Sequence, residues 1–126
     1  METALASFKA KLFRAVLSRV ESIPYSEDPT VPRVCVLFSG GIDCIVVAAM
    51  LAEALPEREP IELINVAFEN PRQTQLLQQQ QKQWGRICTE GFSDDAIFDV
   101  PDRKTGRQGV EELRRIYPGR EWRFVE

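Results

Sequence analysis

Val34-Cys35-Val36-Leu37-Phe38-Ser39-Gly40-Gly41-Ile42-Asp43-Cys44 is the segment that decides the expected fold, and an apolar run at residues 45–51 follows it directly. Its uncharged apolar start predicts a parallel strand at about residues 33–38, covered on both faces, with Cys35 in the core. The paired glycines allow an abrupt turn, and the second apolar run predicts a helix at about residues 42–55. A helix that begins at a small-residue turn directs its free N–H groups at that turn, so the segment predicts an anion site, most often one for phosphate.

Length and composition are those of one globular domain. The chain has 126 residues, of which 44% are hydrophobic and 28% charged, and its net charge of −3 gives no reason to expect nucleic acid as a partner. It has no histidine, which excludes Ser-His and Cys-His nucleophilic pairs. Three separated cysteines argue against a disulfide framework and favour a reducing, cytoplasmic setting, and no apolar run is long enough to span a membrane.

The segments around this unit are expected to supply a further helix and strand. Apolar residues at helical spacing predict an amphipathic helix at residues 3–22 that packs on the sheet; a transit peptide is the less favoured interpretation of its basic face. A mostly apolar run, Ile61–Phe68, predicts a second strand parallel to the first, which completes a β-α-β unit at residues 33–68.

The C-terminal part of the chain is harder to interpret. Residues 69–104 are expected to form an insertion that contains a glutamine-rich run at residues 73–83, which could be helical, disordered or a mixture of both. Thr105, with Gln108 three residues later, predicts the N-cap of a helix. The apolar stretch Trp122–Val125 predicts the beginning of a third strand.

The residues of the turn have separable chemical roles. Ser39 offers a hydroxyl, and the amides from Gly40 to Cys44 can face a phosphate. An acid beside a polyphosphate repels it unless a divalent cation lies between them, so Asp43 is predicted to bind Mg²⁺. The chain has neither the lysine-containing Walker motif nor the G-x-G-x-x-G dinucleotide motif.

Ser-Gly-Gly-x-Asp after an apolar strand resembles the PP-loop of the N-type ATP pyrophosphatases. The basic helix, short loop, strand and apolar helix together resemble the synthetase domain of asparagine synthetase. Val100–Gly106, with Glu111-Glu112-Leu113 behind it, is similar to the eukaryotic asparagine synthetase domain-containing proteins, over most of the chain. The resemblance implies an α/β, Rossmann-like parallel-sheet domain of the adenine nucleotide alpha hydrolase type, incomplete at its C-terminal edge, so that a missing part or a partner chain would complete it.

The same resemblance implies the ligands. In a complete enzyme ATP would activate the side-chain carboxylate of aspartate as an adenylate, and ammonia derived from glutamine would displace AMP to give asparagine. Residue 2 is a glutamate and not the cysteine of a glutaminase, so this chain is not expected to make ammonia itself. The cofactors implied are ATP and Mg²⁺.

The resemblance also implies which residues bind. The pyrophosphate of ATP and its Mg²⁺ would be held by Ser39, Gly40, Gly41, Ile42, Asp43 and Cys44, with Asp43 as the metal ligand. Leu37 and Val66, at the ends of the two strands, would frame the adenine. Cys44 replaces the usual serine, and a thiol is a weak hydrogen-bond donor. No catalytic residue is assigned.

Alternatives remain open at this point. The chain could be a non-catalytic nucleotide-binding or interaction fragment, another PP-loop enzyme such as a tRNA-thiolating one, or a protein whose glycine turn binds nothing. Cys44 could be an activated thiol, although a small packing residue is favoured. The Asp102-Arg103-Lys104 segment could close over phosphates or form a solvated turn.

Overall fold

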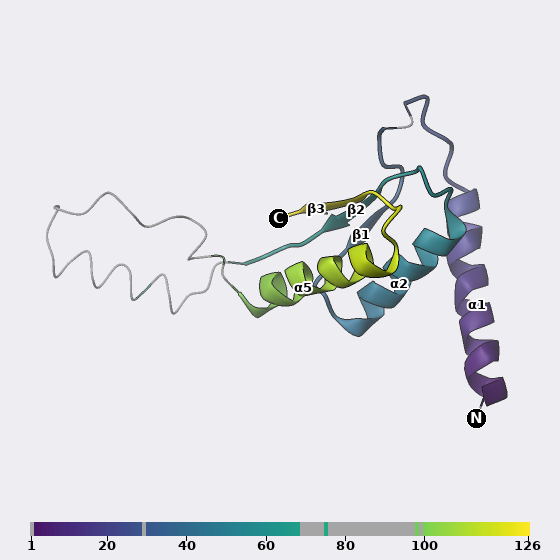
Figure 1. The fold of residues 1–126 in the computed structure, drawn as a ribbon, viewed down its shortest axis with the longest axis horizontal. Coiled ribbons are helices and arrows are strands. Elements are labelled where there is room, and N and C mark those ends of the chain that lie inside the picture. The colour runs from purple at the N-terminus through teal and green to yellow at the C-terminus, as the bar shows by residue number, and fades with distance from the viewer. Residues whose placement is uncertain (1, 29, 69–74, 76–97, 99) are drawn as a thin grey trace, which may run out of the picture.

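The computed structural model describes residues 2–28, 30–68, 75, 98 and 100–126. In chain order its elements are α1 (Glu2–Glu21), β1 (Cys35–Leu37), α2 (Ile42–Ala54), β2 (Ile61–Ile64), α5 (Pro101–Ile116) and β3 (Trp122–Val125) (Figure 1). The expectations for the insertion and its glutamine-rich run fall almost entirely outside the described residues. None of the described helices combines the length and the apolar character needed to cross a bilayer.

The strands form one parallel sheet in the order β1-β2-β3. Val36 pairs with Leu63, and Leu63 with Phe124, so these three side chains share a face. The pairing continues past β1, because the Phe38 amide donates to the Ile64 carbonyl at 2.7 Å. The carboxyl ends of all three strands therefore meet at one edge of an α/β sheet, and in open α/β sheets this is the edge that binds ligands.

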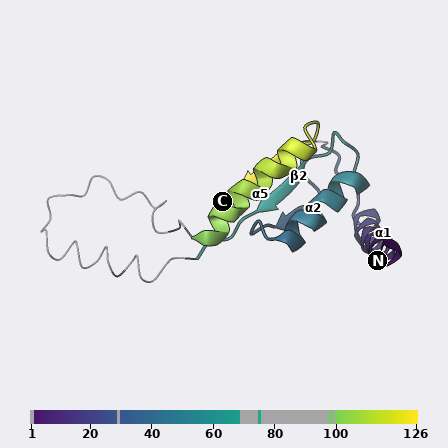
Figure 2. The same cartoon turned by 60° about the horizontal axis from the view of Figure 1, so that its bottom comes forward.

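One face of the sheet is covered by α2 and α5, which lie side by side in both views (Figures 1 and 2). The core between these helices and the sheet is apolar, and its most completely buried large side chains include Phe38, Ile61, Leu63 and Leu113. Burying such a side chain stabilises the fold by about 1.5–3 kcal/mol relative to leaving it exposed. The unbroken apolar run at residues 45–51 lies in α2. It is apolar throughout because α2 packs against the sheet, α1 and α5.

The other face of the sheet is open in the described residues, which corrects the expectation that both faces are covered. Leu37 is 74% exposed and Val125 43% exposed. Cys35, predicted to lie in the core, is exposed because it points to this open face. The position of α1 also differs from expectation, because this helix packs chiefly against α2 and not on the sheet.

Two predicted boundaries are wrong. The second strand ends at Ile64 and not at Phe68, because Asn65 turns its side chain into the core and ends the apolar alternation. The last helix begins at Pro101 and not after Thr105, and its N-cap is Val100. A proline suits the first helical turn, where no N–H partner is needed. The loop expected at Asp102-Arg103-Lys104 is accordingly the first turn of α5.

Candidate functional site

The predicted phosphate turn, Ser39 to Gly41, connects β1 to α2 at the carboxyl edge of the sheet. Ser39, Gly41, Ile42 and Asp43 are exposed, and Gly40 and Cys44 are half-buried. Among the described residues, a Cβ on Gly41 would meet only the Ser39 hydroxyl, at 3.5 Å. In the described part of the chain, the Gly41 side of the turn is therefore unobstructed.

The start of α2 leaves its amides available. Gly41 is the N-cap, with φ −69° and ψ 161°, and it has no side chain to accept a hydrogen bond from the first helical turn. The first N–H groups of a helix have no partner within the helix, and together with the helix dipole they attract anions. The amides of Ile42, Asp43 and Cys44 thus form a small concentration of donors beside the turn.

The two side chains expected to help bind phosphate differ in their availability. Ser39 is exposed, and its hydroxyl accepts a long hydrogen bond of 3.4 Å from the Gly41 amide. The Cys44 thiol donates within the turn to the Gly41 carbonyl, at 3.0 Å, and lies 3.9 Å from the Ser39 hydroxyl. Cys44 therefore closes the turn through its side chain, and only its backbone amide, in the first turn of α2, is left for the role predicted from the sequence.

Asp43 is the acidic residue of the first turn of α2. Among the described residues, no three Asp, Glu, Cys or His side chains converge as a set of metal ligands. A magnesium ion commonly keeps several waters and binds one carboxylate together with substrate phosphates. Asp43 supplies one exposed carboxylate, as a site of that kind would need from the protein.

Leu37 and Val66, expected to frame an adenine, both lie at the carboxyl edge with exposed side chains. Leu37 is the last residue of β1, and Val66 follows the end of β2 with 53% of its surface exposed. Leu37 pairs in register with Ile64, two residues before Val66. The structure thus leaves apolar surface next to the turn, as a nucleobase would need.

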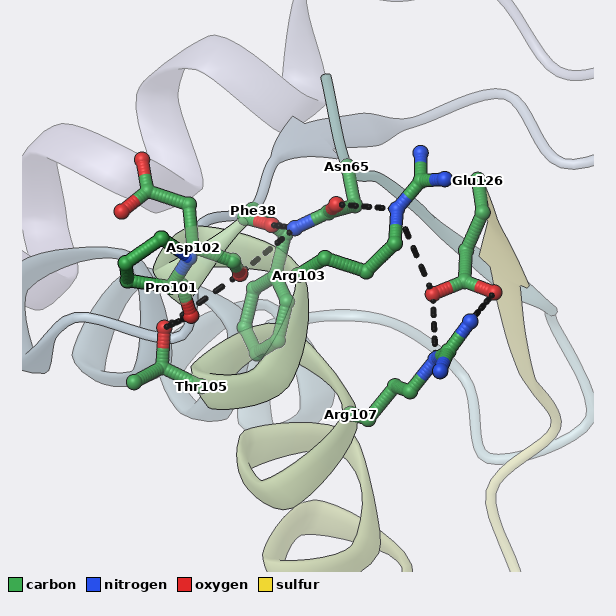
Figure 3. Close-up of polar contacts among 8 residues, drawn as sticks. All are labelled: Phe38, Asn65, Pro101, Asp102, Arg103, Thr105, Arg107 and Glu126. Atoms are coloured by element: carbon green, nitrogen blue, oxygen red, sulfur yellow. Dashed lines mark hydrogen bonds and ion pairs between the residues drawn. The ribbon is translucent and has the colours of Figure 1, made fainter. Parts of the chain in front are cut away.

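A polar cluster behind the turn was not found from the sequence. Asn65 is 3% exposed and donates through Nδ2 to the Phe38 carbonyl at 2.8 Å and to the Asp102 carbonyl at 3.0 Å (Figure 3). Its Oδ1 receives the Arg103 Nε at 3.4 Å, and Arg103 in turn lies 3.6 Å from Glu126. The sequence held one signal of this cluster, which is the position of Asn65 at the end of an apolar strand. A buried asparagine side chain needs hydrogen-bond partners.

Glu126, at the end of this cluster, is expected to make stability depend on pH. Two hydrogen bonds from Arg107, at 2.6 and 2.8 Å, hold the pKa of the Glu126 carboxyl below its ordinary value of 4.5. A lowered carboxyl pKa stabilises the fold above the unfolded pKa, and that contribution is lost as the pH falls through the folded pKa. Because Arg107 is 55% exposed, Glu126→Gln should cost less than about 1 kcal/mol in urea unfolding at about pH 7, and this cost should shrink as the pH is lowered below 4.5. A cost that does not decrease with the pH would contradict the assignment.

Comparison with known proteins identifies relatives of the whole described region. Asparagine synthetase domain-containing protein 1 of Gallus gallus is 42% identical over 113 residues, covering 78% of this chain and 18% of the chicken protein. The Homo sapiens protein of the same name is 36% identical over 151 aligned residues, covering 100% of this chain and 24% of the human protein. The chain is a homologue of the asparagine synthetase domain-containing proteins.

The Saccharomyces cerevisiae member of these proteins extends the similarity to a fungus, with 37% identity over 123 residues, covering 93% of this chain and 19% of the yeast protein. The chain spans between 18% and 24% of the length of the three relatives. No protein-family model and no solved structure matches it.

Proposed function

We propose that the Ser39–Cys44 turn binds the phosphates of ATP together with Mg²⁺, as the nucleotide-binding part of an asparagine synthetase-like, PP-loop domain. The observation that carries this proposal is the open turn itself, which joins a strand of a parallel sheet to a helix whose N-cap is glycine. In this arrangement the helix amides and Ser39 supply phosphate donors, and Asp43 supplies a carboxylate for Mg²⁺. The names of the relatives agree with a domain of this kind.

The adenine would lie against the exposed surface of Leu37 and Val66. Both side chains are apolar and exposed at the strand ends. An adenine ring that covered them would remove apolar surface from water, which favours binding. The nucleotide would then run from the strand ends toward the start of α2, with its phosphates at the turn.

In the complete protein, the reaction would be that of an asparagine synthetase. The aspartate carboxylate would attack the α-phosphorus of ATP, pyrophosphate would leave, and ammonia would then displace AMP. The chain's own residues would hold the phosphate charge at the turn, which stabilises the leaving pyrophosphate by electrostatic positioning. The acceptor site would come from parts of the protein beyond the residues described.

A second candidate is nucleotide binding without the reaction. It is favoured by Cys44, whose thiol is engaged with the Gly41 carbonyl and cannot donate to a phosphate at the same time. Isotopic ATP–pyrophosphate exchange distinguishes the two: exchange that requires aspartate supports the synthetase, whereas ATP binding without exchange supports the second candidate.

The binding itself is tested with a double substitution. Ser39→Ala with Asp43→Asn removes the hydroxyl and the proposed metal carboxylate. It should weaken Mg-ATP binding at least about tenfold, because one charge-assisted hydrogen bond alone is worth that much. Isothermal titration calorimetry gives the affinity. Ser26→Ala with Asp28→Asn is the matched control, because these residues offer the same groups in another exposed loop. Full Mg-ATP affinity in the Ser39/Asp43 variant would refute the site.

A further inference from the structure

The N-terminal half of α5 lies directly against the turn at Ser39–Gly41. A Cβ on Gly109 would lie 3.3 Å from the Gly40 Cα and 3.1 Å from the Phe38 ring. A Cβ on Gly106 would lie 2.6 Å from the Asn65 amide nitrogen. Larger residues at these two positions would hold the helix away, so the glycines let α5 approach the backbone of the turn.

Two hydrogen bonds join this part of α5 and Asn65 to consecutive carbonyls of the turn. The Thr105 hydroxyl lies 2.6 Å from the Ser39 carbonyl oxygen and 3.2 and 3.3 Å from the Pro101 and Asp102 carbonyls, so its one hydrogen goes to Ser39, the shortest contact. Asn65 Nδ2 donates to the Phe38 carbonyl at 2.8 Å, and its other hydrogen goes to Asp102 in the first turn of α5 (Figure 3). Both donors therefore hold the backbone from the side on which α5 lies.

A tethered carbonyl also orients an amide, because the peptide unit is planar and trans. In such a unit the C=O and the N–H of the next residue point in opposite directions. Drawing the Phe38 and Ser39 carbonyls toward Asn65 and Thr105 turns the Ser39 and Gly40 N–H groups away from α5. Within the described residues neither of these N–H groups donates a hydrogen bond, so both are available to an anion on the open side.

We propose that Asn65 and Thr105 are positioning residues, which aim the Ser39 and Gly40 amides at the nucleotide phosphates without touching the nucleotide. This inference rests on the proposed binding of Mg-ATP at the turn. Asn65 suits the role because its amide nitrogen carries two hydrogens, one for the Phe38 carbonyl after β1 and one for the Asp102 carbonyl in α5. An aspartate has no hydrogen to donate, and its negative charge would be repelled by the two carbonyl oxygens. Arg103 on the Asn65 oxygen orients that amide.

Thr105→Val gives the cleanest test, because valine keeps the branched shape and removes the hydroxyl. The substitution should weaken Mg-ATP binding about three- to tenfold, the effect of losing one hydrogen bond that orients a donor. Without nucleotide, it should change the NMR shift of the Gly40 amide and speed its hydrogen exchange. Thr105→Ser retains the hydroxyl and should restore both measurements.

The matched control is Thr30→Val. Thr30 also donates its hydroxyl at 2.6 Å, but to Asp28 in a loop remote from the turn. Thr30→Val should leave the Mg-ATP affinity and the NMR shift and hydrogen exchange of the Gly40 amide unchanged. Asn65→Asp, assayed in the same way, should reproduce the Thr105→Val effect at the Ser39 amide.

The results separate this inference from the proposed function. If the unmodified protein does not bind Mg-ATP, the proposed function fails, and the amide measurements alone decide whether Thr105 orients the turn. If Mg-ATP binds and Thr105→Val changes neither its affinity nor the Gly40 amide, the positioning role is refuted. A loss of affinity that merely follows a drop in melting temperature, without rescue by serine, also overturns it.

Discussion

Gly40→Ala is expected to destabilise the fold by at least about 2 kcal/mol and to abolish the proposed binding of Mg-ATP at the turn. Gly40 has φ +80°, a region that costs an L-residue roughly 1–2 kcal/mol. Its Cβ would also lie 2.1 Å from the Thr105 carbonyl oxygen and 2.5 Å from the Gly106 nitrogen. Both atoms are backbone, so α5 has to move away from the sheet.

Urea unfolding and Mg-ATP titration of this variant measure the two consequences. Gly41→Ala is the matched control, because Gly41 has an extended conformation and a Cβ there meets only the Ser39 hydroxyl at 3.5 Å. It should change stability by less than about 0.5 kcal/mol, as surface substitutions do. If Gly40→Ala were as stable as Gly41→Ala, the close contact between the turn and α5 would be wrong.

Arg120→Leu is expected to cost about 3–5 kcal/mol of stability, because hydrogen bonds to a charged group are worth about 1.5–3 kcal/mol each and buried carbonyls would be left without a donor. Arg120 is 8% exposed and donates to four carbonyls, two at the C-terminal end of α2 and two in the loop that follows it. Nη2 reaches Ala52 and Leu55 at 2.6 and 2.9 Å, and Nη1 reaches Pro56 and Glu59. Burial lowers the pKa of Arg120 from its ordinary value, yet an arginine remains charged and suits the negative end of the helix.

The loss follows from what leucine leaves behind. The last carbonyls of α2 have no partner in the helix, and without Arg120 the buried ones remain unsatisfied. Chemical denaturation monitored by circular dichroism measures the change. Arg120→Lys should recover only part of it, because an ammonium cannot reach four oxygens with the guanidinium's planar geometry.

Arg115→Leu is the control for removing an arginine as such. Arg115 is 77% exposed and lies 3.7 Å from Glu112 on the surface of α5, a kind of pair worth about 0–1 kcal/mol. If Arg120→Leu cost no more than Arg115→Leu, the capping of α2 by Arg120 would not contribute to stability. Because Arg120 is far from the turn, its variants should weaken Mg-ATP binding only in proportion to the unfolded fraction.

Local patterns in the sequence predicted the unit around the turn well. The helix expected at about residues 42–55 is observed at Ile42–Ala54, and the strand expected at about 33–38 contains β1. These elements depend on residues within one or two helical turns of each other: an apolar run, a pair of glycines and a second apolar run. The parallel pairing of β1 and β2 follows as well, because a helix connects them.

The errors arose where distant residues compete with local signals. Thr105 has the spacing of a capping box, but its hydroxyl bonds the Ser39 carbonyl, which is 66 residues away in sequence, and the helix begins at Pro101. Cys35 lies in an apolar strand but faces the side of the sheet that the described residues leave open. The sequence near Thr105 does not indicate its contact with Ser39, and the sequence near Cys35 does not indicate which face of the sheet is open.

The sequence by itself determined the strand, the glycine turn and the helix start, because backbone preference and hydrophobic period act over a few residues. Only the tertiary structure decided which groups hold that turn. Asn65 and Thr105 reach it across 27 and 66 positions, through hydrogen bonds whose geometry exists only after α5 has packed on the sheet. Such bonds depend on distances between elements, and a one-dimensional pattern does not contain those distances.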